Sequence, residues 1–198
     1  QNNKSDILMN GNNISNNFEF DQYLKRFSYN FKNENKEFGG YAILNNKKIS
    51  IVVDVGAPPS FKFSSKYQSG ALSFEVSSNG KKLISNCGYY EGKNSKLVKL
   101  SKSTATHSTL VIDDSSSCRF KKYNKNYFVN NSLKILKKNI VFEKNYWKIS
   151  ASHDGYNQKY NTVHEREIEF YPEQFKFIGT DKIINKKLKL NIKFDIRF

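Results

Sequence analysis

Residues 70–86 read GALSFEVSSNGKKLISN, and this stretch decides the fold class of the chain. Apolar and polar residues alternate from Leu72 to Val76, which is typical of a strand with one buried face. Asn79–Gly80 supplies the two residues that most readily adopt left-handed backbone angles, so it predicts a tight hairpin turn. Leu83 and Ile84 then begin the return strand. The stretch therefore predicts a β-hairpin.

Short apolar runs separated by turn residues continue along the chain after this hairpin. Such a succession of strands is typical of an antiparallel β-sandwich. We count about ten strands by this pattern and predict an all-β chain with a short N-terminal helix or linker. The other expected strands and hairpins lie in segments 41–55, 107–112, 140–149, 163–171, 175–183 and 188–198.

The first part of the chain has a different pattern. Residues 1–17 are mostly Asn, Ser and Lys, which predicts a loop or a disordered end. Aromatic residues and Leu24 recur at spacings of three and four between Phe18 and Phe31, which predicts a short amphipathic helix. Residues 150–162 lack a clear period and are expected to form a long loop.

The chain is strongly basic, with a formal net charge of +15 over 198 residues. Such a charge favours a polyanionic partner. Codon bias is the alternative explanation, because Lys, Asn, Ile, Phe and Tyr are all encoded by A/T-rich codons. The lysines are dispersed, and aromatic motifs of RNA-binding folds are missing, so we expect no specific nucleic-acid partner. No run of eighteen apolar residues predicts a membrane span.

The cysteines and the two ends of the chain are less informative. Cys87 and Cys118 are able to pair, but two cysteines are too few for a disulfide scaffold and do not indicate a compartment. The sequence starts at Gln1 rather than Met, and the last apolar alternation stops at Phe198. We therefore expect the chain to be a piece of a longer protein.

Several short motifs follow one another in a distinctive order. They are GGY (39–41), VDVGAPP (53–59), SGALSFE (69–75), NCG (86–88), TATHST (104–109), HDGY (153–156), HER (164–166) and IKFDIRF (192–198). As an ordered set they resemble the C-terminal β-sandwich domain of the heparinase II/III-like polysaccharide lyase family. The resemblance implies that residues 38–198 are this sandwich, truncated at its C-terminus. It also implies that residues 1–37 are a linker and the remnant of an α/α-toroid domain.

The resemblance further implies an activity for the full-length parent. In this family the toroid performs β-elimination on a uronic acid, which requires a base, neutralisation of the carboxylate and an acid for the leaving oxygen. The parent is thus expected to be a lyase acting on an acidic polysaccharide such as a glycosaminoglycan, in the periplasm or cell envelope. The isolated chain is expected to be inactive, with the polysaccharide and its own missing toroid as partners. The alternative is a non-catalytic carbohydrate-binding or structural module.

A first group of candidate site residues follows from the same resemblance. The family places a sugar-contacting histidine at the position of Gln68, and glutamine can hydrogen-bond a sugar but cannot transfer a proton. Some members hold zinc through positions that correspond to Gln68, Asn86 and His107. Only His107 is a good zinc ligand, and three or four are required, so we expect no metal or other cofactor. The alternative is that His107 belongs to a buried hydrogen-bonded cluster with Gln68 and Asn86.

A second group surrounds the HDGY and HER motifs. A loop with this sequence can present a stacking ring and a proton carrier to a sugar. The structural alternatives are that Tyr156 anchors the loop and that residues 164–167 are the charged start of a strand. The catalytic candidates are His107, His153 and Tyr156, and the substrate-binding candidates are Gln68, Asn86, His153, Tyr156, His164 and Arg166.

Overall fold

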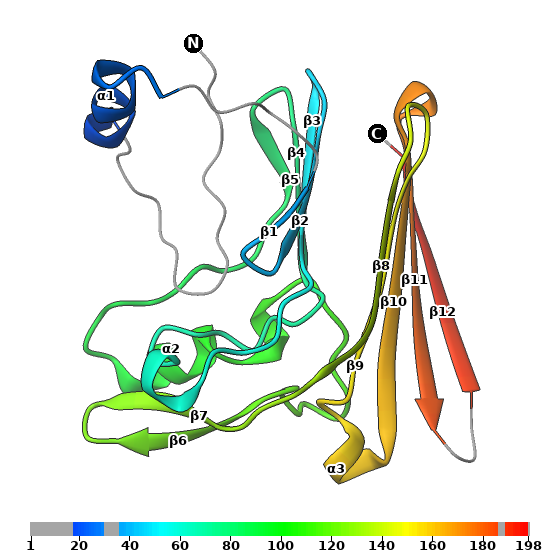
Figure 1. Ribbon diagram of the computed structural model, residues 1–198. Coiled ribbons are helices and arrows are strands. Elements are labelled where there is room, and N and C mark those ends of the chain that lie inside the picture. The colour runs from blue at the N-terminus through cyan, green and yellow to red at the C-terminus, as the bar shows by residue number, and fades with distance from the viewer. Residues whose placement is uncertain (1–17, 30–35, 186–188, 198) are drawn as a thin grey trace.

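The computed structural model describes residues 18–29, 36–185 and 189–197, and it is built mainly of antiparallel strands (Figure 1). Within these residues, twelve strands form two five-stranded sheets and one two-stranded sheet. The prediction of an all-β sandwich with a short N-terminal helix is therefore confirmed.

The first sheet follows sequence order, so that each strand pairs with the next one along the chain. Its last hairpin turns at Asn79 and Gly80, whose φ angles of 49° and 77° are left-handed, as the sequence predicts. The central strand is the most buried because it has a neighbour on each side and a sheet packed against one face. The strands are β1 (Lys36–Phe38), β2 (Tyr41–Asn45), β3 (Ile49–Asp54), β4 (Phe74–Ser78) and β5 (Lys81–Ile84).

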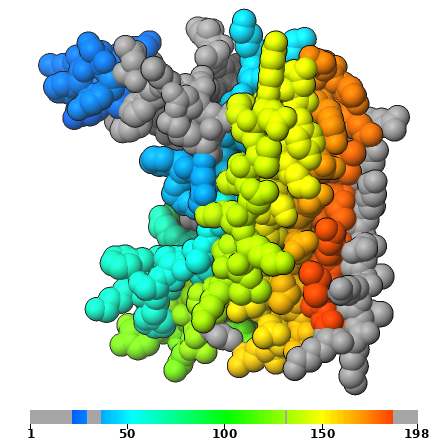
Figure 2. Space-filling model, turned by 45° about the vertical axis from the view of Figure 1, so that its right-hand side comes forward, coloured from blue at the N-terminus to red at the C-terminus, as the bar shows by residue number. Residues whose placement is uncertain are grey.

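The second sheet is also antiparallel, in the order β12-β11-β10-β9-β8. The hairpin predicted around Lys144 is present, since the Glu143 backbone N–H donates to the Tyr146 carbonyl oxygen at 2.9 Å. Figure 2 shows this sheet as one continuous face of the molecule, from yellow-green β8 to orange β11. The strands are β8 (Ile135–Phe142), β9 (Trp147–His153), β10 (Thr162–Tyr171), β11 (Lys176–Asn185) and β12 (Lys189–Arg197).

Short elements fill the connection between the two sheets and lie below the first sheet in Figure 1. Helix α1 (Phe18–Arg26) stands apart from both sheets in Figures 1 and 2. The remaining elements are η1 (Phe61–Phe63), α2 (Ser95–Ser101), η2 (Thr104–Thr106), β6 (Arg119–Tyr123), β7 (Asn126–Asn131), α3 (Asn157–Tyr160) and η3 (Pro172–Gln174).

The strand predicted at residues 107–112 is wrong. The chain leaves η2 there and forms an irregular loop, because Ser108 bonds to side chains and to another segment rather than to a strand partner. Its backbone N–H donates to Asn86 Oδ1 at 2.9 Å, and its hydroxyl donates to the Phe74 carbonyl oxygen. Such side-chain to backbone bonds compete with strand pairing.

Two other boundaries also differ from the predictions. The loop predicted over residues 150–162 is shorter, since β9 continues to His153 and α3 follows. The helix predicted up to Phe31 ends at Arg26. Its expected last residues at 30 and 31 and the loop predicted for residues 1–17 lie outside the described residues.

Three points from the composition complete the comparison. Cys87 and Cys118 are both free thiols, the first exposed and the second buried. No helix in the described part of the chain is long and apolar enough to cross a bilayer. The domain boundary expected between residues 37 and 38 stays a prediction.

Apolar side chains of both five-stranded sheets meet in one core. The Phe74 ring of β4 stacks on the Phe177 ring of β11 with centroids 5.3 Å apart. Within the second sheet, Trp147 packs on Phe170 at 5.1 Å. The two sheets are therefore held face to face by aromatic packing. Other buried members are Ala42, Leu44, Ile49, Ile51, Val53, Val55, Leu72, Val76, Ile149, Ala151 and Ile168.

Replacing the fully buried Phe177 by alanine is expected to lower the free energy of unfolding by about 3–5 kcal/mol, because the change opens a cavity at the sheet interface. Urea denaturation measures this loss. Phe63→Ala is the matched control, since Phe63 is 79% exposed, and it is expected to cost less than about 0.5 kcal/mol. Equal losses in the two variants would contradict the assigned core.

Candidate functional site

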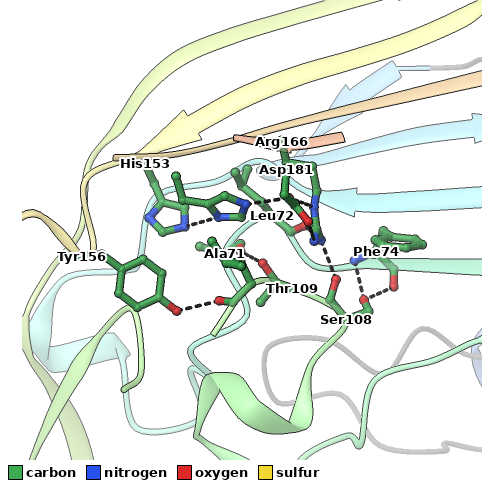
Figure 3. Close-up of polar contacts among 11 residues, drawn as sticks. Ala71, Leu72, Phe74, Ser108, Thr109, His153, Tyr156, Arg166 and Asp181 are labelled. Carbon is green, nitrogen blue, oxygen red and sulfur yellow. Dashed lines mark hydrogen bonds and ion pairs between the residues drawn. The ribbon is translucent and has the colours of Figure 1, made fainter. Parts of the chain in front are cut away.

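Three neighbouring strands of the second sheet bring one polar cluster together (Figure 3). His153 at the end of β9 lies directly opposite His164 of β10 in the strand register. Arg166, two residues further along the same face of β10, lies opposite Asp181 of β11. The strand registers therefore place the four side chains side by side on one face of the second sheet, and their burial shows that this face is covered.

A chain of hydrogen bonds fixes the protonation of both imidazoles. The Gly155 backbone N–H donates to His153 Nδ1 at 3.1 Å, so the proton of a neutral His153 resides on Nε2. His153 Nε2 then donates to His164 Nδ1 at 3.1 Å, and His164 Nε2 donates to Asp181 Oδ1 at 2.7 Å. Both imidazoles are thereby satisfied in their neutral form.

Arg166 completes the cluster and connects it to the rest of the molecule. Its Nε and Nη2 donate to the two carboxylate oxygens of Asp181, each at 2.7 Å. Its Nη1 donates to the Leu72 carbonyl oxygen at 2.8 Å and to the Ser108 carbonyl oxygen at 2.6 Å. The guanidinium thus joins the second sheet to two loops beside the first.

Burial controls the charge of these groups. It lowers the pKa of His153 well below its usual value, and the neighbouring His164 lowers it further. Burial also lowers the pKa of His164, despite the opposing effect of Asp181. Burial raises the pKa of Asp181, but bonds from His164 and Arg166 outweigh it and lower that pKa to about 2. The cluster therefore holds one ion pair and two neutral histidines near pH 7.

Tyr156 anchors the loop that follows β9. Only 1% of the residue is exposed, and its hydroxyl donates to the Leu110 carbonyl oxygen at 2.6 Å. Its ring lies 5.7 Å from that of His153. These contacts agree with the structural alternative for Tyr156, and contact of His153, Tyr156, His164 or Arg166 with a substrate stays a prediction.

The first candidate group is less closely assembled. Gln68 is fully buried, and its amide nitrogen donates to the carbonyl oxygens of Gly88 and Ser101, each at 2.7 Å. The Asn86 amide oxygen accepts the backbone N–H of Ser108, the residue after His107, rather than a bond from the His107 imidazole. His107 Nδ1 donates to the Ser103 carbonyl oxygen at 2.8 Å, while its buried Nε2 has no hydrogen-bond partner among the described residues. A role for Gln68, Asn86 or His107 in catalysis or substrate binding stays a prediction.

These three residues do not fit a zinc ion. The amide nitrogen of Gln68 already donates two bonds to carbonyl oxygens, and the amide oxygen of Asn86 accepts from a backbone N–H. Only His107 is then left as a typical ligand, whereas a structural zinc site requires four. Throughout the described ranges, no three His, Cys, Asp or Glu side chains form a metal-binding group. We therefore assign no step to a metal.

Asp181 is the member of the cluster that the sequence reasoning missed. A usable signal exists in the charges of the last hairpin. With the turn placed at Pro172–Gln174, the register sets Asp181 opposite Arg166 and Lys182 opposite Glu165. Two complementary pairs in adjacent register positions indicate a cross-strand ion pair.

Comparison with known proteins agrees with this architecture. A family model described as heparinase II/III-like, C-terminal, matches residues 35–198. A mutant of the heparan sulfate lyase HepC from Pedobacter heparinus superposes with a TM-score of 0.67 at 17% identity, covering 90% of this chain and 29% of that one. A heparinase III with methylated lysines gives a TM-score of 0.64 at 18% identity, covering 91% and 29%. A further heparinase III gives 0.58 at 19%, covering 85% and 28%.

These matches cover only part of each solved structure. The chain spans less than a third of the length of each of these structures, and at such identities the likeness shows the fold. No curated protein matches the chain.

The neutral histidines make stability dependent on pH. Their pKa values are lowered in the folded state, so the unfolded chain takes up protons first when the pH falls below about 6.5. The free energy of unfolding should therefore fall between pH 7 and pH 5. His153→Gln keeps a donor towards His164 and removes one titrating group, so its fall should be shallower by up to about 1.4 kcal/mol per pH unit. Urea denaturation at several pH values tests this, and parallel slopes would contradict it.

Added zinc is expected to leave the melting temperature unchanged. A bound ion whose free concentration is a hundred times its Kd would stabilise the folded state by about 2.7 kcal/mol. Thermal denaturation readily detects such a change. A zinc-dependent rise that disappears in His107→Asn would contradict our interpretation of the His107 group.

Proposed function

Because the chain belongs to the heparinase II/III-like family, whose C-terminal domain it matches over residues 35–198, we propose that it is the sandwich part of a polysaccharide lyase. The full-length parent would cleave a uronic-acid polysaccharide by β-elimination, with the reacting groups on an α/α-toroid domain. The match of the family model over most of the chain is the observation that supports this proposal.

The burial of the histidines supports a non-catalytic role for the isolated chain. Abstraction of the proton α to a carboxylate needs a base that reaches the sugar. The chain has three histidines, and His107, His153 and His164 are 9%, 1% and 0% exposed. The two imidazoles of the cluster are also engaged in hydrogen bonds to each other and to Asp181. The chain then stabilises and shapes a site whose base comes from the toroid.

A carbohydrate-binding module without any catalytic partner is the second candidate. The excess of 33 Lys and Arg over 18 Asp and Glu favours it, because an acidic polymer is attracted to such a chain whether or not it is cleaved. Under either proposal the ligand is an acidic polysaccharide, and we place the parent in the periplasm or cell envelope.

The 198-residue chain is expected to release no unsaturated uronate from heparan sulfate, hyaluronan or alginate, because its histidines are buried and its described residues form no α/α-toroid. Absorbance at the wavelength of the unsaturated product measures this directly. The parent protein, with its upstream region, is the positive control and is expected to act on at least one uronic-acid polymer. Turnover by the chain alone would contradict the proposal that the reacting groups lie on the toroid. An inactive parent would favour the binding module.

A further inference from the structure

Two hollows adjoin at the end of the sandwich where α2, β6 and α3 lie. The larger, of about 540 Å³, is bounded by residues 115–119, by Ser132 and by the loop Asp154–Tyr160 that carries α3. The smaller, of about 340 Å³, is lined by Lys99 of α2, by Lys102 and Ser103 after it, and by residues of β6 and β7. Both volumes are within the range of known ligand pockets. Since Ser116, Cys118 and Arg119 line both hollows, we treat them as one groove, the Arg119 groove.

The walls of the Arg119 groove carry mostly positive charge. Lys99, Lys102, Arg119 and Lys159 line it, and Asp154 is its one carboxylate. That carboxylate is engaged in the loop itself, where Oδ1 accepts the Lys134 backbone N–H at 2.6 Å. The groove therefore presents a positive potential to a ligand.

Arg119 stands where the two hollows meet. Arg119 is exposed. Among the described residues, no side chain or carbonyl group forms a hydrogen bond or ion pair with its guanidinium. A guanidinium has five donors arranged for bidentate binding of a carboxylate or a sulfate. Arg119 is thus the cation best placed to bind an incoming anion.

Hydroxyl groups and rings supply the other contacts that sugars use. In the larger hollow, Ser115 Oγ lies 2.7 Å from both the Tyr160 hydroxyl and Lys159 Nζ. In the smaller hollow, Phe120 and Tyr127 line the wall beside Lys102. Aromatic walls with a few placed polar and charged groups are typical of ligand-binding pockets.

Lys102 contributes charge from beneath the surface. It is 1% exposed, and its Nζ donates to the carbonyl oxygens of Ser65 and Tyr67 at 2.6 and 2.7 Å. The ammonium also lies 5.2 Å from the Phe120 ring centroid, which is part of the groove wall. Burial lowers the pKa of Lys102 to about 8, so the side chain remains mostly protonated at pH 7. This fixed cation strengthens the positive potential of the groove.

We propose that the Arg119 groove binds the carboxylate or sulfate groups of an acidic oligosaccharide, with successive sugars on either side of Arg119. The inference rests on the proposed function in that it takes an acidic polysaccharide as the ligand. It adds a binding site on the sandwich itself. This site is built from residues outside the polar cluster of His153, His164, Arg166 and Asp181. Binding at this groove would hold polymer to the domain independently of any bond cleavage.

Calorimetric titration of the 198-residue chain with a heparin hexasaccharide tests the proposal at fixed ionic strength. Arg119→Glu is expected to weaken binding at least about tenfold, because a hydrogen-bonded charge pair is lost. Lys159→Glu, in the larger hollow, is expected to weaken it similarly. Lys144→Glu is the matched control, since it makes the same charge change in the turn between β8 and β9, at the opposite end of the second sheet from α3 (Figure 1). It is expected to change the Kd by about twofold at most.

Three outcomes would overturn the proposal. They are no binding of either the hexasaccharide or an oligogalacturonate, equal weakening by all three reversals as in simple ion exchange, and wild-type affinity in Arg119→Glu or Lys159→Glu. Thermal denaturation confirms that each variant is folded. An oligogalacturonate used in parallel distinguishes carboxylate from sulfate recognition, and binding of either sugar with loss in Arg119→Glu supports the groove.

The test also separates this inference from the proposed function. An inactive parent with intact Arg119-dependent binding would refute the lyase and leave the groove in place. An active parent whose sandwich binds heparin equally well with Arg119→Glu would refute the groove and leave the lyase in place.

Discussion

The arrangement of this domain depends on the hydrogen bonds and the ion pair that the buried guanidinium of Arg166 forms. A charge taken out of water is tolerated only when it is paired and its hydrogen-bonding capacity is used. Asp181 supplies the charge, and the carbonyl oxygens of Leu72 and Ser108 supply the remaining acceptors. Because the two carbonyl groups belong to loops beside the first sheet, the second sheet can only dock where those loops present them. Removal of one partner from such a pair typically costs about 3–5 kcal/mol.

Local signals explain which parts of the fold were predictable. The turn at Asn79–Gly80 and the alternation in β10 and β11 are properties of a few adjacent residues, and the structure follows them. The segment 107–112 is apolar enough for a strand, but Ser108 bonds to Asn86 and to β4, which are far away in the sequence. Pattern reasoning cannot include partners that only the tertiary structure brings close.

The site shows the same division between local and distant information. The HDGY and HER motifs contain His153 and His164, but the burial of these imidazoles depends on how the two sheets pack. Glu75 is a related case, since it alternates with apolar neighbours as an exposed residue would, but it is 4% exposed. Its carboxylate accepts the Asn86 backbone N–H at 3.1 Å and lies 3.5 Å from Lys82 Nζ. The alternation in the sequence therefore does not reveal that Glu75 is buried.

The backbone of Leu72 illustrates a compromise at this junction. Its φ of 60° is left-handed, which costs a non-glycine residue about 1–2 kcal/mol. Its side chain is 1% exposed, and burying a leucine contributes about 1.5–3 kcal/mol. Glycine would relieve the torsion but leave a void, while a β-branched residue would fill the space at a higher torsional cost. Torsional strain and burial therefore oppose each other at this position, and an aliphatic residue that is not branched at Cβ gives the smallest combined cost.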